Sequence, residues 1–231
     1  MARQPLVHIV GIDCATREAS TGVCLATWDG RHLTIAEACT CRPDRTAEDA
    51  ARGWLADAPS GIVALDAPLG WPDPLTCALA DHQAGGRLPF VADDLFARET
   101  DRAITRRHGR TPPHIDGNQV ARTSLAALHL LSRLREDLGR PIPLAWASGA
   151  PDGLVAIEVF PAATARAHGQ DGTLPSWVTP NPHPAMTRTM HARDAILSAV
   201  AAVDMLEGRA VPPRGAEQER LSRREGWIWA R

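Results

Sequence analysis

Apolar and polar stretches alternate along the first third of the chain. The pattern predicts strands over residues 6–15, 22–27 and 33–39. Asp29-Gly30 lies between the last two of these strands and is typical of a hairpin turn. A helical pattern over 46–56, with Thr46 as its N-cap, then leads to a fourth apolar run at 62–65. A helical crossover of this kind produces a parallel pair and can place the fourth strand beside the first.

The remaining chain contains an irregular stretch and two long helical patterns. Residues 67–115 are rich in proline and glycine, with one short helical stretch near 95–107, and we expect them to form an inserted lid. Beyond this lid, the pattern predicts a helix over 118–138, a strand over 154–160 and a helix over 189–207. Trp227-Ile228-Trp229 could add an edge strand to the five of the sheet. We therefore expect a single α/β domain over 1–231. Its mixed five-stranded sheet has three antiparallel strands followed by parallel ones and is flanked by helices.

Composition narrows the range of functions. The formal net charge of the 231-residue chain is -2, which excludes a strongly basic coat for nucleic acid. All 25 cationic residues are arginine, and the absence of lysine excludes a Walker-type phosphate loop and Schiff-base chemistry. The five cysteines lack the spacing of a structural zinc site. No apolar run could span a membrane and no signal peptide is evident, so we expect a cytoplasmic protein that does not contact membranes.

Four carboxylates lie near the ends of predicted elements. Asp13 and Asp66 end two strands, Glu158 lies within the fifth strand, and Asp194 lies near the start of the last helix. Ligands of open α/β sheets bind beyond the carboxyl ends of the strands, so the first two acids should meet at one site. Each acid also has a structural explanation. A strand-end aspartate can cap the following turn, and the helix dipole can stabilise Asp194 near the helix N-terminus. Glu158 can pair with an arginine.

Cationic and imidazole groups accompany these acids. His191 lies three residues before Asp194 on one helix face, where it can orient a water or transfer a proton, although a capping or exposed histidine fits the same spacing. Arginines recur at every fourth residue, at 98, 102, 106 and 110, and form a ridge that could hold phosphates or simply face solvent. We slightly favour substrate contact by Arg98 and Arg102.

Six short motifs stand in an order that resembles a known family. They are Gly11-Ile12-Asp13, Leu65-Asp66-Ala67-Pro68-Leu69-Gly70, Arg98-Glu99-Thr100-Asp101-Arg102, Ile157-Glu158-Val159-Phe160-Pro161, His191-Ala192-Arg193-Asp194-Ala195 and Glu225-Gly226-Trp227-Ile228. Together they resemble the predicted-nuclease family called domain of unknown function 429, within the RNase H-like superfamily. His191 and Asp194 are also similar to the last motif of RuvC-type resolvases. RNase H proper takes a further acid from its first helix, and here Glu48 and Asp49 lie in no matching motif.

The resemblance implies a metal-dependent nuclease. Asp13, Asp66 and Asp194 would bind Mg²⁺ or Mn²⁺, Glu158 would be an additional or substitute ligand, and His191 would complete the catalytic set. The substrate would be nucleic acid or a nucleotide. It would be contacted by residues of two of the motifs, Arg98, Asp101, Arg102 and Arg193.

Two other functions and the oligomeric state stay open on the sequence. An actin-like ATP-dependent phosphotransferase shares the strand order, but its phosphate loop requires Asp-x-Gly-x-Thr where this chain has Asp13-Cys14-Ala15-Thr16. A non-catalytic module that binds nucleic acid or nucleotide could keep the same fold. A homodimer formed through exposed tryptophans is a further possibility.

Overall fold

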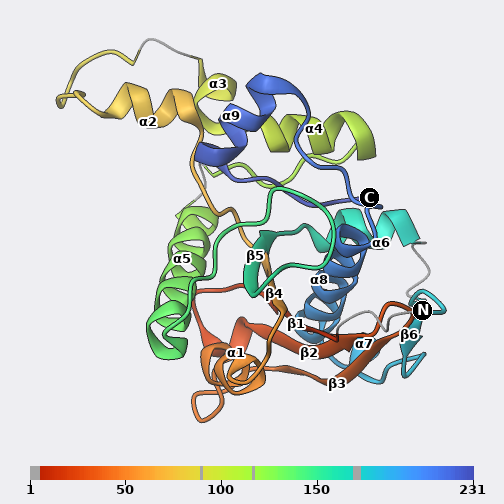
Figure 1. The fold of residues 1–231 in the computed structure, drawn as a ribbon. Helices are drawn as coiled ribbons and strands as arrows, with labels where there is room; N and C mark the ends of the chain where they lie inside the picture. Colours follow the sequence, from red (N-terminus) through yellow and green to blue (C-terminus); the bar gives the residue numbers. More distant parts are fainter. Residues whose placement is uncertain (1–5, 89–90, 116–117, 169–172) are drawn as a thin grey trace.

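A central mixed sheet organises the molecule (Figure 1). The computed structural model describes residues 6–88, 91–115, 118–168 and 173–231. Within these residues six strands pair in the order β5-β4-β1-β2-β3-β6. The strands are β1 (Val7–Asp13), β2 (Gly22–Trp28), β3 (Leu33–Thr40), β4 (Gly61–Asp66), β5 (Leu154–Glu158) and β6 (Val178–Thr179).

Strand directions confirm the expected mixed sheet. β1, β2 and β3 are antiparallel neighbours, whereas β4 is parallel to β1 and β5 is parallel to β4. The prediction of five strands missed β6, which contains only Val178 and Thr179 and pairs in parallel with β3. Two residues after a proline-rich loop carry no period that a sequence pattern can reveal. Backbone pairing with Leu33 and Thr34 of β3 creates this strand.

Helices cover both faces of the sheet and build a lobe beside it. They are α1 (Ala47–Leu55), α2 (Asp73–Leu79), α3 (Ala92–Phe96), α4 (Glu99–His108), α5 (Asn118–Leu138), α6 (Pro161–His168), α7 (Ala185–Arg188), α8 (Met190–Leu206) and α9 (Gly215–Glu225), with a 3-10 turn at Glu18–Ser20. α8 packs across β1 to β4 and also contacts α6 and α7. α1 and α5 pack together on the opposite face. The result is three layers, helix on sheet on helix.

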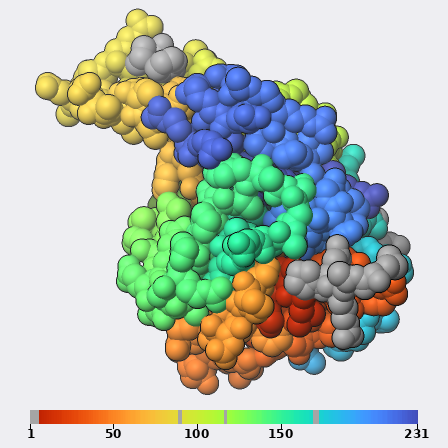
Figure 2. All heavy atoms as spheres, in the orientation of Figure 1, coloured from red at the N-terminus to blue at the C-terminus, as the bar shows by residue number. Residues whose placement is uncertain are grey.

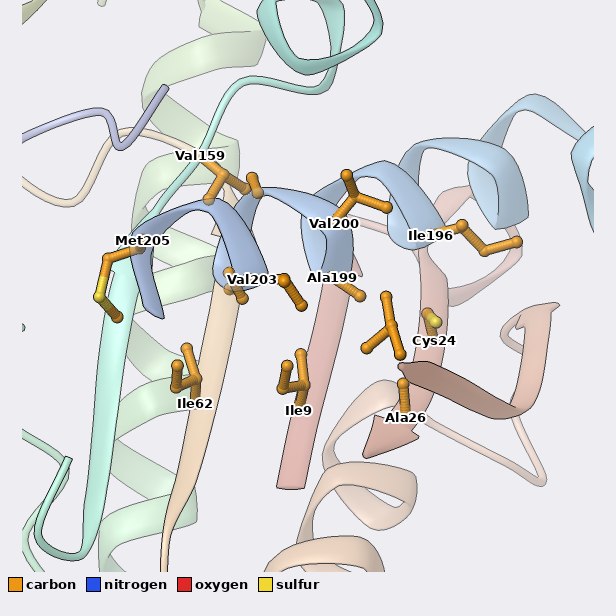
Figure 3. Packing of buried hydrophobic residues seen from close by; sticks show 14 of the residues in the cluster. Ile9, Cys24, Ala26, Ile62, Val159, Ile196, Ala199, Val200, Val203 and Met205 are labelled. Atoms are coloured by element: carbon orange, nitrogen blue, oxygen red, sulfur yellow. The ribbon is translucent and has the colours of Figure 1, made fainter. Parts of the chain in front are cut away.

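Alternation along the strands divides the core between these two faces. In β1, Ile9 belongs to the cluster beneath α8, whereas Val10 and Ile12 belong to the cluster beneath α1 and α5. In Figure 3, Ile9 and Ile62 of the central strands lie beneath α8. α8 is itself almost entirely buried because it is the central helix of its layer. The period-2 pattern of the strands therefore builds both apolar layers at once.

Two glycines allow α8 to lie unusually close to the strands. A Cβ atom on Gly11 would lie 2.1 Å from the backbone oxygen of Ala195, and one on Gly22 would lie 2.0 Å from the backbone oxygen of His191. A side chain at either position would therefore push the helix away from the sheet. This close packing brings the first turns of α8 to the carboxyl end of β1.

A separate lobe lies beyond β4 and combines two distant parts of the chain. The expected lid at 67–115 contributes α2, α3 and α4, and α9 near the C-terminus packs against α2 and α4. In Figure 2 the yellow α2 segment projects away from the body beside the blue α9. Residues 89–90 of the expected lid lie outside the described residues. The lobe therefore needs residues 215–225 as well as the predicted insertion.

A single buried glutamate joins the helices of this lobe. One carboxylate oxygen of Glu225 accepts a hydrogen bond from the Asp73 backbone N–H at 2.8 Å, and the other accepts one from the Glu99 backbone N–H at 2.7 Å. These N–H groups belong to the first residues of α2 and α4, which lack intrahelical partners. Glu225, the last residue of α9, therefore caps both helices. Its negative charge also interacts favourably with the positive N-terminal ends of their dipoles.

The tail tryptophans belong to the core. Trp227 and Trp229 are buried, and the backbone N–H of Trp229 donates to the Glu158 carbonyl beside β5. All seven tryptophans of the chain lie within the described residues and none is exposed. The expectation of exposed tryptophans was therefore wrong. No helix in the described part of the chain is long and apolar enough to cross a membrane.

Candidate functional site

The two strand-end aspartates lie side by side at the carboxyl edge of the sheet. Asp13 of β1 and Asp66 of β4 are direct partners in the parallel register. Both line a cavity of about 360 Å³ between the sheet, the start of α5 and the lobe. Burial in adjacent central strands fixes both backbones, and the parallel direction places both carboxyl groups at the same edge.

The start of α8 brings a histidine to this edge. His191 Nδ1 lies 2.7 Å from Asp13 Oδ2, although 178 residues separate the two in the chain. An ionised Asp13 carboxylate can only accept, so Nδ1 of His191 donates in this pair, which leaves Nε2 free for other partners. One turn later, Asp194 is half-buried and pairs with its neighbour Arg193 at 2.9 Å. Asp194 does not line the cavity but lies close enough for its charge to act on both strand-end acids.

These acids repel one another in a poorly solvated setting. Burial raises the pKa of Asp13 to about 6, with a further contribution from Asp194, against the opposing hydrogen bond of His191. Burial also raises the pKa of Asp66 well above its usual value, and the charges of Asp13, Asp194 and Glu158 add to the effect. A cluster that holds negative charge at this cost is typical of sites that bind a cation or transfer protons.

Asp66 is partly exposed and differs from Asp13 and Asp194 because none of the described residues neutralises it. Its carboxylate makes no hydrogen bond or ion pair with any of the residues that the structure describes. Within those same residues, no three His, Cys, Asp or Glu side chains form a ready-made metal site. The structure thus provides a pair of cavity-lining carboxylates, Asp13 and Asp66, with one histidine attached.

Glu158 lies in the same cavity wall, but both of its carboxylate oxygens already accept hydrogen bonds. Its Oε1 accepts from Arg98 Nη2 at 2.7 Å, and its Oε2 accepts from Arg98 Nη1 at 2.9 Å and from the Leu69 backbone N–H at 3.0 Å. Glu158 and Arg98 are 3% and 1% exposed. The structure therefore favours the arginine partner for Glu158, the alternative that the sequence left open.

Arg98 has no donor left for a substrate. Besides its two bonds to Glu158, its guanidinium donates twice to Asp101 and once to the Glu225 carbonyl. Five hydrogen bonds use all five N–H groups of an arginine. Asp101 accepts these bonds and is 1% exposed, so it is equally unavailable. This buried cluster connects β5, the start of α4 and the end of α9.

The other two residues expected to contact substrate lie away from the cavity. Arg102 is partly exposed, donates to the Asp93 carbonyl and lies 3.9 Å from a carboxylate oxygen of Asp94. Arg193 is exposed and pairs with Asp194. Neither residue lines the cavity that contains Asp13 and Asp66.

The cavity also has walls that sequence reasoning missed. Gln119 and Thr123 come from successive turns of α5, whose four-residue spacing places them on one face. The apolar lining residues are Ala67, Pro68, Pro112, Pro113, Val120, Val159, Phe160 and Ile228. Cys14 follows Asp13, and burial raises the pKa of its thiol, with contributions from both aspartates. The thiol is therefore protonated and a poor nucleophile.

The order of the motifs can now be compared with known proteins. The family model described as protein of unknown function (DUF429) matches residues 11–220, which is most of the chain. The chain belongs to the DUF429 family. The match includes Asp13, Asp66 and His191 of this DUF429 protein, so the cavity-lining acids and the attached histidine fall within the family's shared region. Comparisons with curated proteins and with solved structures find no match.

Proposed function

We propose that this DUF429 protein is a metal-dependent nuclease that hydrolyses phosphodiester bonds of nucleic acid in the cavity lined by Asp13 and Asp66. One observation carries the proposal. The two carboxylates are register partners on parallel central strands, line one cavity, and include an Asp66 that is unneutralised within the described structure. Proteins rarely keep such a costly arrangement without a ligand that compensates the charge.

The residues fit one hard divalent cation better than two. Mg²⁺ prefers oxygen donors and is commonly bound by one or two protein carboxylates together with substrate phosphate. Asp13 and Asp66 supply that donor set, and Asp194 adds negative charge beside it. Glu158 is held by Arg98 and Leu69, which removes it from the ligand set that the resemblance implied. Mg²⁺ or Mn²⁺ would activate water and stabilise the leaving oxygen when bound.

The protein's own groups prepare the remaining chemistry. The hydrogen bond from Nδ1 to Asp13 fixes the imidazole of His191 and leaves Nε2 to accept or return a proton. Gln119 and Thr123 offer neutral donors for phosphate oxygens on the α5 side of the cavity. The proline-rich wall at Pro112 and Pro113, with Phe160, presents apolar surface to a sugar or a base and excludes water.

The RNase H-like assignment belongs to this proposal. It is supported by the sheet order, in which the crossover through α1 places β4 beside β1, and by the position of α8 across the central strands. His191 and Asp194 at the start of α8, beside Asp13, are the placement that the RuvC-like motif implies. No observation favours the phosphotransferase alternative.

Cleavage assays test the proposal directly. Wild-type protein is incubated with Mg²⁺ or Mn²⁺ and a panel of branched, single-stranded and RNA–DNA hybrid substrates, beside Asp13→Asn and Asp66→Asn. We expect at least one substrate to be cut, and each substitution to lower the rate by about 100-fold or more. Calorimetric titration with Mn²⁺ alone should show binding that either substitution weakens.

The matched control is Asp57→Asn, since the Asp57 side chain is exposed and makes no hydrogen bond or ion pair in the described structure. This variant should cut and bind Mn²⁺ like wild type. The nuclease proposal is abandoned if Asp13→Asn binds Mn²⁺ and cuts every responsive substrate as well as wild type does.

A further inference from the structure

A second depression, lined by arginines, lies at the C-terminal end of α4. Its lining residues are Arg107, His108, Gly109, Arg166, Ala167 and Arg231, and its volume is about 550 Å³. No acidic side chain is among these described residues. Arg107, Arg166 and Arg231 form no ion pair with any residue that the structure describes, unlike Arg106 next in the chain, which pairs with Glu99.

The negative ends of two helix dipoles offset only part of the positive charge of these arginines. The depression lies at the C-terminal ends of α4 and α6, where partial negative charge favours cationic side chains. Each helix end contributes roughly half an elementary charge, so two ends offset about one of the three arginines. Arg107 also lies near Arg214 and Arg106, and burial together with these charges lowers the pKa of its guanidinium. A net positive potential therefore remains at the surface.

A buried histidine with an unused nitrogen lines the same depression. His108 is 8% exposed, and its Nε2 has no hydrogen-bond partner within the described structure. An unpaired polar atom is unfavourable in a buried position, so this nitrogen calls for a partner such as a water or an ion. Burial, Arg107 and Arg166 lower the pKa of His108, which an approaching anion would reverse.

Three segments connect this depression to the acid cavity. α4 runs from Arg98 in the cavity wall to His108 in the depression, Phe160 leads into α6 and Arg166, and Ile228 leads to Arg231. In Figure 1 the C-terminus lies beside α4 and α6, and Arg107 donates to the Ala230 carbonyl at 3.3 Å. Ten residues of α-helix span about 15 Å, the length of about four nucleotides of a helical strand.

We propose that the arginine depression binds backbone phosphates of a nucleic-acid strand whose scissile bond lies in the cavity of Asp13 and Asp66. The inference rests on the proposed function and specifies its substrate. The protein acts on a strand several nucleotides long, held at both ends of α4, rather than on a free nucleotide. Three exposed arginines supply the phosphate contacts.

Binding without turnover tests the inference separately from catalysis. Fluorescein-labelled 12-nucleotide DNA and RNA strands are titrated in EDTA and followed by anisotropy, with wild type and Arg107→Ala/Arg166→Ala. We expect the variant to bind about tenfold more weakly. For this variant, the slope of log affinity against log salt concentration should be shallower by about 1.4. Each phosphate contact on a single strand contributes about 0.7 to that slope.

The control variant is Arg31→Ala/Arg87→Ala, which removes the same charge from two exposed arginines that form no ion pair in the described structure. It should bind like wild type. Hydrolysis of the small substrate bis(4-nitrophenyl) phosphate should be equal in all three proteins, whereas KM for the 12-nucleotide strand should rise about tenfold in Arg107→Ala/Arg166→Ala.

Two outcomes overturn the inference. One is an unchanged strand affinity and salt dependence in Arg107→Ala/Arg166→Ala. The other is thermal stabilisation by inorganic phosphate that disappears in this variant while strand affinity does not change, because the depression then binds a free anion. An absence of cleavage by any protein, with the binding difference intact, contradicts the proposed function instead.

Discussion

Two groups of carboxylates border the same cavity and have opposite surroundings. Glu158 and Asp101 accept four of the five hydrogen bonds that the Arg98 guanidinium donates, and each also accepts one from a backbone N–H group. Asp13 has only His191 as a partner, and Asp66 has none within the described residues. Glu158 and Asp101 are almost fully buried, whereas Asp13 and Asp66 are partly exposed, but exposure alone does not tell which acid is neutralised. The number of partners does.

The difference assigns a separate task to each group. The Arg98 cluster joins β5 to α4 and α9 and so holds the lobe above the sheet. Asp13, Asp66 and Asp194 add repulsion that the fold has to tolerate. Removing a charge from the Arg98 cluster should therefore destabilise the folded protein. Removing one from the Asp13, Asp66 and Asp194 group should stabilise it.

The largest effect is expected from Arg98→Met. It leaves Glu158 and Asp101 as buried, unpaired charges, so the free energy of unfolding in urea should fall by about 3–5 kcal/mol. Arg106→Met is the control, because its ion pair with Glu99 lies at the surface and should contribute less than about 1 kcal/mol. A loss from Arg98→Met as small as that of the control would show that the buried cluster is not the anchor of the lobe.

A smaller loss is expected where α8 meets the acidic edge. Gly22→Ala places a methyl group 2.0 Å from the His191 backbone oxygen, so the helix must shift. We expect unfolding to become easier by about 1–3 kcal/mol and Mn²⁺ binding to weaken, as measured by urea titration and calorimetry. Gly53→Ala on α1 meets open space and should instead stabilise the protein slightly, by about 0.5–1 kcal/mol. Equal behaviour of the two variants would contradict the role given to Gly22.

A gain rather than a loss of stability is expected from substitution of Asp66. The raised pKa means that the folded protein binds the proton more tightly than the unfolded chain, so stability falls as pH rises above the unfolded pKa of about 4. Asp66→Asn removes this penalty and should raise the free energy of unfolding by about 1–2 kcal/mol at pH 8, with little gain at pH 3.5. Asp57→Asn should change neither value. A destabilised Asp66→Asn at pH 8 would mean that Asp66 has a stabilising partner.

The smallest effect is expected at Cys14, which lines the cavity next to Asp13. Burial raises the pKa of its thiol, so the sulfur takes no part in nucleophilic attack. Cys14→Ala should keep the cleavage rate within about threefold of wild type, as measured on the most responsive substrate of the panel. A loss as large as that of Asp13→Asn would transfer the chemistry from the carboxylates to the thiol.

The sequence determined the layers of the fold and predicted where the candidate site lies. Strands β1 to β5 and the long helices have regular apolar periods over several residues, and the short crossover indicated that β4 could lie beside β1. Two acids at the ends of such strands must share an edge. The family match and the position of His191 were also accessible from short motifs.

Only the tertiary structure decided which charged groups are partners. Arg98 and Glu158 are 60 residues apart, Asp13 and His191 are 178 apart, and α9 joins a lobe that begins at Asp73. Local periodicity is set by neighbours within a few residues, whereas pairing depends on which segments the core brings together. An acid between apolar residues therefore looks the same in sequence whether it is neutralised, as Glu158 is, or left to bind a ligand, as we propose for Asp66.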